Sequence, residues 1–94
     1  MITRLVKLTL QSSQVDDFIS LFHSTRESIR SFPGCSGVQL FRDLQDKDIV
    51  FTYSTWDSTE ALETYRKSDL FRITWEKAKK CFSKPAEAWS LVEK

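Results

Sequence analysis

The sequence predicts a small α+β domain in which helices cover one face of an antiparallel sheet. Three observations support this fold class. Residues 2–10 alternate apolar and polar side chains, which is typical of a half-buried strand. Residues 13–31 place apolar side chains three and four positions apart, which predicts an amphipathic helix. Two apolar stretches at 36–43 and 49–56 flank a short charged turn, which predicts a hairpin. With a second helical region and a final strand at 88–92, the order is β-α-β-β-α-β, the ferredoxin-like arrangement.

Size and composition place the whole chain, residues 1–94, in one globular domain. The chain is 40% hydrophobic and 13% aromatic, which excludes a disordered protein. Its 14 basic and 13 acidic residues give a net charge of +1, so no basic surface for nucleic acid or an anionic membrane is expected. No apolar stretch is long enough to span a bilayer, and the chain starts directly in a strand pattern rather than in a signal peptide. We therefore expect a cytoplasmic protein without nucleic-acid or membrane partners.

The ends of the helices carry local signals. Ser13 with Asp16 three residues later resembles a capping box, and Pro33-Gly34 is expected to end the first helix. Asp57 is the expected cap of the second helical region. Ser68 and Asp69 form a further cap signal, so this region is predicted as two pieces that reach about residue 82.

The strand at 49–56 has no face suited to water. Ile49, Phe51 and Tyr53 lie on one side, while Val50 and Trp56 lie on the other. A strand that is apolar on both sides is covered on both sides, and the helices of so short a chain can cover only one. This pattern predicts a homodimer through the sheet face, with the strand at 88–92 as the segment that crosses between chains.

The sequence contains few residues for conventional catalysis. It has one histidine, no asparagine, no glycine-rich phosphate loop and no metal-ligand spacing. Cys35 and Cys81 are far apart and are expected to be reduced thiols. An activity would therefore depend on a shaped apolar cavity between helices and sheet, with neither a metal nor a cofactor.

Three aromatic residues of the second helical region are candidates for that cavity. Tyr65 carries a hydroxyl on an apolar stripe, where it is either a core residue or a hydrogen-bond donor to a ligand. Trp75 shares a stripe with Phe71, and both are either core or cavity wall.

Three further candidates lie outside this helical region. Arg26 falls between Phe22 and Ile29 on the first helix, where its guanidinium either reaches solvent or an acidic neighbour, or points into the cavity to hold an anionic oxygen. His23 lies at the border of the same stripe, and Tyr53 lies on the hairpin. We count His23, Tyr53 and Phe71 as candidate substrate contacts.

The segment 56–71, W-D-S-T-E-A-L-E-T-Y-R-K-S-D-L-F, resembles a motif of the antibiotic biosynthesis monooxygenase (ABM) superfamily, W-x-S-x-E-A-L-x-x-[YW]-x-x-S-x-x-F. The F-P-G-C stretch at 32–35 and the first strand fit the same layout. The resemblance implies a dimeric α+β barrel. It also implies an activity among those of the superfamily, which include cofactor-independent oxidation of anthrones and quinols, haem degradation and action on a signalling furanone.

Haem is not implied for this chain. Haem-degrading members use an Asn, a Trp and a haem-ligating His where this sequence has Val6, Tyr65 and Trp75. Two functions remain. The first is a cofactor-free monooxygenase of a small aromatic or quinol-like substrate, in which Arg26 stabilises charge, Tyr65 donates a hydrogen bond and Trp75 shapes the wall. The second is a non-catalytic dimeric module that binds a small apolar ligand or assembles.

Overall fold

A computed structural model describes all residues of the chain, 1–94. The elements are β1 (Ile2–Thr9), a 3-10 turn η1 (Ser12–Gln14), α1 (Val15–Arg30), β2 (Cys35–Arg42), β3 (Ile49–Trp56), α2 (Thr59–Arg66), α3 (Asp69–Lys79) and β4 (Glu87–Leu91). This order confirms the predicted ferredoxin-like arrangement, with the second helical region split in two.

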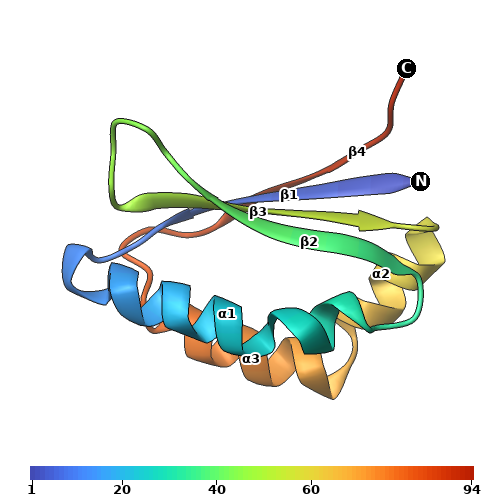
Figure 1. Cartoon of the computed structure of the whole chain (residues 1–94), viewed down its shortest axis with the longest axis horizontal. Coiled ribbons are helices and arrows are strands. Elements are labelled where there is room, and N and C mark those ends of the chain that lie inside the picture. The colour runs from blue at the N-terminus through green and yellow to red at the C-terminus, as the bar shows by residue number, and fades with distance from the viewer.

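The four strands form one antiparallel sheet in the order β2-β3-β1-β4. Figure 1 shows α1, α2 and α3 on the same side of this sheet, with the opposite face left open. None of the helices combines the length and the apolarity that crossing a membrane requires.

The helix ends differ from the predicted ones at three places. The expected capping box at Ser13 is wrong, because η1 precedes α1 and the N-cap residue Gln14 makes no capping hydrogen bond with its side chain. Ser58, rather than Asp57, caps α2 by accepting a hydrogen bond from the Ala61 amide at 3.1 Å. The Asp57 carboxylate is already engaged, since it accepts a hydrogen bond from Ser36 Oγ at 3.2 Å.

In the second helical region, one predicted cap is confirmed and the last helix is shorter than predicted. Ser68 caps α3 as predicted and accepts a hydrogen bond from the Phe71 amide at 3.1 Å. The helix ends at Lys79 rather than near 82. The chain turns there because its next residues pair with the end of β1, where the Ser83 amide donates to the Thr9 carbonyl at 2.9 Å.

The turn between α1 and β2 depends on Gly34. Its φ is +86°, a conformation that L side chains rarely adopt. A methyl group at this position would overlap the side chain of Ala61 on α2. The glycine therefore lets the turn approach α2 closely.

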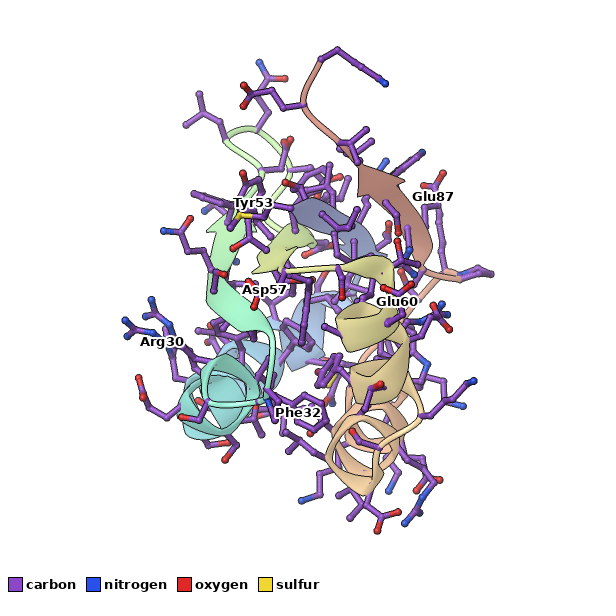
Figure 2. The ribbon with its side chains drawn as sticks, turned by 90° about the vertical axis from the view of Figure 1, so that its right-hand side faces the viewer. Arg30, Phe32, Tyr53, Asp57, Glu60 and Glu87 are labelled. Carbon is purple, nitrogen blue, oxygen red and sulfur yellow. The ribbon has the colours of Figure 1, made fainter.

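The core lies between the sheet and the helices. Its largest fully buried side chains are Trp56, Leu8, Leu10 and Val50. The other face of the sheet leaves Phe41 51% exposed, Tyr53 38%, Trp89 42% and Leu91 45%. Figure 2 shows Tyr53 on the side of the sheet away from the helices. We call this surface the open face.

Candidate functional site

A cavity of about 310 Å³ lies between the helices and the helix-facing side of the sheet. Its walls come from all four strands on one side and from α1, α2 and α3 on the other. The lining is mostly apolar, with few polar side chains, as is typical of small-molecule sites. Its volume is at the lower end of the usual range for such sites, so it suits a small ring system.

One wall of the cavity is a continuous series of aromatic rings. Tyr65 stacks on Trp56, with ring centroids 4.8 Å apart and planes 27° apart. Phe71 meets Tyr65 edge-on at 5.3 Å and stacks on Trp75 at 5.6 Å. Phe32 closes the end of this series, 5.4 Å from Tyr65, and lies between α1 and the α2–α3 pair in Figure 2. Such a wall fits the flat face of an aromatic ligand.

The hydroxyl of Tyr65 is the polar group of this wall. None of the hydrogen bonds within the chain uses it. Burial, with a smaller contribution from Cys35, raises its pKa to about 12. The hydroxyl therefore keeps its proton at neutral pH and can donate a hydrogen bond to a ligand oxygen.

A polar row crosses the sheet beneath the cavity. Arg4 on β1 lies opposite Ser54 on β3 and opposite Ser90 on β4. The Arg4 guanidinium donates from Nη1 to Ser90 Oγ at 2.9 Å. Ser54 Oγ accepts a buried hydrogen bond from Trp56 Nε1 at 3.0 Å. The row thus places a cation and the Ser54 hydroxyl on the floor of the cavity, and Ser90, which holds the cation, lies just outside the lining.

Two arginines line this cavity, and only one of them forms an ion pair. Arg66 on α2 forms an ion pair with Glu63 at 3.1 Å. Arg4 forms no ion pair with a carboxylate. Burial lowers the pKa of the Arg4 guanidinium and the charge of Arg66 lowers it further, while Glu63 acts in the opposite direction. The cavity therefore contains more positive than negative charge.

The lining offers no general base. It contains no Asp, Glu, His, Lys or Cys, and its remaining polar side chains are threonine hydroxyls at 25, 52 and 74. Cys35 and Cys81 are free thiols outside the lining, and burial raises the pKa of each. No group of three His, Cys, Asp or Glu side chains comes together in a way that could hold a metal ion.

The structure brings three of the six predicted site residues together. Tyr65, Trp75 and Phe71 all line the cavity. His23 is exposed on α1, where its ring meets Phe22 edge-on at 5.7 Å, and it lines no part of the cavity.

Arg26 and Tyr53 line a different depression, which we call the edge groove. It lies at the edge strand β2 beside α1 and also includes Arg30, Ser36 and Gln39. Of the two orientations left open for Arg26, the structure does not show the one into the cavity. Helix α1 packs against β2, so the flank that carries Arg26 turns toward this edge, where its Nε is buried without a hydrogen-bond partner.

The sequence did contain a signal for Arg4, which was missed. The apolar side chains of β1 that face the cavity occupy even positions, and Arg4 shares that parity with Val6 and Leu8. A charged residue in the register of a buried face is the exception that indicates a site. Ser54 and Trp56 follow the same parity on β3.

Comparisons with known proteins agree with this architecture. The family profile "Antibiotic biosynthesis monooxygenase" (ABM) matches residues 1–77. No curated protein sequence matches the chain. A conserved protein from Methanosarcina mazei Go1 superimposes with a TM-score of 0.92 at 22% identity, covering 100% of this chain and 94% of that one.

Two further solved structures have the same fold. One is named as an antibiotic biosynthesis monooxygenase and gives a TM-score of 0.91 at 16% identity, covering 99% of this chain and 98% of that one. The other is Rv0793 from Mycobacterium tuberculosis, with a TM-score of 0.88 at 14% identity, covering 98% and 93%. Because the family profile spans residues 1–77 of 94, the chain belongs to the antibiotic biosynthesis monooxygenase family.

Proposed function

We propose that the protein is a cofactor-independent monooxygenase of a small aromatic or quinol-like substrate. The observation that carries this proposal is the apolar cavity, in which the protonated Tyr65 hydroxyl lies within a wall of aromatic rings. Membership of the ABM family supports the reaction type.

The reaction uses electrons of the substrate alone. The substrate loses one proton to water, and the resulting anion passes one electron to O₂. The two radicals combine to a peroxide anion on the ring carbon, which takes up one proton from water to become a hydroperoxide. Loss of water then converts a ring CH₂ into C=O. One oxygen atom enters the product, the other leaves as water, and the substrate supplies all four electrons. The Tyr65 hydroxyl donates a hydrogen bond to the enolate oxygen, while Trp75 and Phe71 hold the ring and exclude water.

Oxygen uptake with a panel of anthrones and hydroquinones tests the proposal. We expect uptake above the uncatalysed rate and a loss of roughly tenfold or more in kcat for Tyr65→Phe, because the oxyanion loses a donor. Tyr53→Phe tests the edge groove in the same way. No uptake with any substrate, or a loss in Tyr53→Phe with Tyr65→Phe fully active, contradicts the proposal.

A second candidate is a non-catalytic binding protein that uses the same cavity. The lack of a general base in the lining favours it. In that case aromatic ligands quench the fluorescence of Trp56 and Trp75, yet no member of the panel gives oxygen uptake.

We also propose that two copies pair through the open face. Its exposed apolar side chains belong to three of the four strands, and leaving them in water is costly. A second copy presents the same apolar surface, so pairing covers both at once.

A further inference from the structure

The cavity contains one cation, Arg4, that forms no ion pair with a carboxylate. Arg4 reaches the helix-facing side of β1, among Val6 and Leu8, and its guanidinium has a neutral partner in Ser90. The ion pairs of the chain use Lys7, Arg30, Arg66 and Arg72 instead. A partly buried guanidinium is stabilised by an anion, and a serine hydroxyl supplies none.

The surroundings of Arg4 strengthen this point. Arg66 lines the same cavity and lies near enough to repel Arg4, while the carboxylate of Glu63 already forms an ion pair with Arg66. An anion in the cavity would relieve both the repulsion and the loss of hydration at Arg4. Neutral ligands would relieve neither.

The absence of a general base in the lining also points to an anionic ligand. No lining side chain can take a proton at neutral pH, because the hydroxyls of the threonines, of Ser54 and of Tyr65 are all poor bases. A ligand that reacts as an anion must therefore lose its proton in water before it enters. Arg4 is the lining group placed to select that ionised form.

We propose that the cavity binds an ionised aromatic acid, with its ring against Phe71 and Trp75 and its anionic oxygen, carboxylate or phenolate, held by Arg4. This inference rests on the proposed function and narrows it to substrates that are ionised before they bind. Ser90 is a positioning residue, since its hydroxyl oxygen accepts a hydrogen bond from Arg4 Nη1 and restrains the guanidinium. The remaining N–H groups of Arg4 stay available to the ligand.

Ligand binding by inert probes tests this inference apart from turnover. The probes are 2-naphthoate and its neutral isostere 2-naphthamide, followed by calorimetry or tryptophan fluorescence. We expect 2-naphthoate to bind roughly tenfold or more tightly, which is the usual gain from a hydrogen bond to a charged group. 2-Naphthol, titrated through its own ionisation, separates the phenolate from the carboxylate.

Variants test whether the preference for the anionic probe depends on the Arg4 guanidinium. Arg4→Gln is expected to abolish the preference for the anion, so that 2-naphthoate and 2-naphthamide bind with similar affinity. Arg4→Lys keeps the charge but loses the planar fork, so it retains part of the preference and serves as the second variant if Arg4→Gln does not fold. Arg72→Gln is the matched control, because it removes the same charge from an exposed position on α3 outside the cavity. Arg26→Gln tests the edge groove.

The outcomes separate the inference from the proposed function. Equal affinity for the charged and neutral probes, or an anion preference that survives Arg4→Gln, overturns the inference. Loss of that preference in Arg26→Gln also overturns it. Absence of oxygen uptake with intact anion binding contradicts only the monooxygenase, whereas oxygen uptake that is unaffected by Arg4→Gln contradicts only the inference. For a series of substrates, kcat/KM is expected to fall at acidic pH, and the midpoint of that fall should match the pKa of each substrate.

Discussion

The ring of Tyr65 stacks on the ring of Trp56, with centroids 4.8 Å apart, so a residue of α2 rests directly on the end of β3. Trp56 is fully buried, and Tyr65 also meets Phe32 and Phe71 edge-on. The cavity wall is therefore also a part of the core. Substitutions here have to separate the role of the ring from the role of the hydroxyl.

Tyr65→Phe and Tyr65→Ala make that separation. Phenylalanine keeps every ring contact, so we expect the free energy of unfolding to change by less than about 0.5 kcal/mol. Alanine removes the stack and leaves a cavity, which we expect to cost roughly 2–4 kcal/mol. Urea unfolding measures both. A large loss of stability in Tyr65→Phe would show that the hydroxyl itself has a structural partner.

The raised pKa of Tyr65 makes stability depend on alkaline pH. Its pKa is about 12 in the folded chain against 10.0 for an ordinary tyrosine, so the unfolded chain loses this proton first. The free energy of unfolding should therefore fall as the pH rises from 10 to about 12, by roughly 2–3 kcal/mol in total. Below pH 10 this contribution is fully present.

Comparison with Tyr65→Phe isolates this group, because the other residues that titrate at high pH are common to both proteins. Urea unfolding at a series of alkaline pH values should show a shallower decline in the variant. The same slope in both proteins would mean that Tyr65 titrates normally.

The turn glycine offers a test of backbone strain and contact together. Gly34→Ala combines a positive φ with an overlap against Ala61, so we expect a loss of about 2 kcal/mol or more. Ala61→Gly in the same chain removes the overlap but not the strain, so a double-mutant cycle should show favourable coupling. Gly37→Ala is the control, since its methyl would meet Thr55 Oγ1 at an ordinary 3.8 Å. Equal losses at Gly34 and Gly37 would contradict this account.

The buried hydrogen bond between Trp56 and Ser54 is expected to stabilise the floor of the cavity. Ser54→Ala leaves the indole N–H without its acceptor at 3.0 Å, which should cost about 1–3 kcal/mol. In a Trp56→Phe background the same substitution should cost much less, because no donor remains. Ser90→Ala, an exposed serine, should change stability by less than about 0.5 kcal/mol. Equal effects of Ser54→Ala in both backgrounds would exclude this hydrogen bond as the cause.

Periodicity predicted the fold of this chain well, because alternation and helical spacing are properties of neighbouring residues. The strand at 49–56 was predicted with the bounds that the structure gives it. Helix ends were less predictable. The Asp57 carboxylate, for example, accepts a hydrogen bond from Ser36 on β2 instead of capping α2. The sequence alone does not show such long-range competition for a side chain.

The site was predicted only in part, because local spacing is visible in the sequence and long-range contacts are not. Tyr65, Trp75 and Phe71 could be assigned to the cavity because their helical stripe faces the sheet. The orientation of Arg26 stayed open because a helical wheel gives an angle around the helix axis but not which strand lies beneath that angle. Arg4 interrupts the apolar pattern of β1, yet it lies on the same face of the strand as Leu8, so the pattern of apolar residues alone does not indicate its place in the cavity.

The open face leads to the last prediction. Phe41 is 51% exposed on this face, and its ring meets Tyr53 edge-on at 6.3 Å. If two copies pair here, light scattering should return twice the chain mass of 11.0 kDa, and Phe41→Lys should return the single mass. Leu44→Lys is the matched control, because Leu44 is 97% exposed in the turn between β2 and β3 rather than on the sheet. A single mass for the unsubstituted chain at micromolar concentration would refute the pairing. Equal dissociation by Phe41→Lys and Leu44→Lys would place the contact elsewhere, because only Phe41 belongs to the open face.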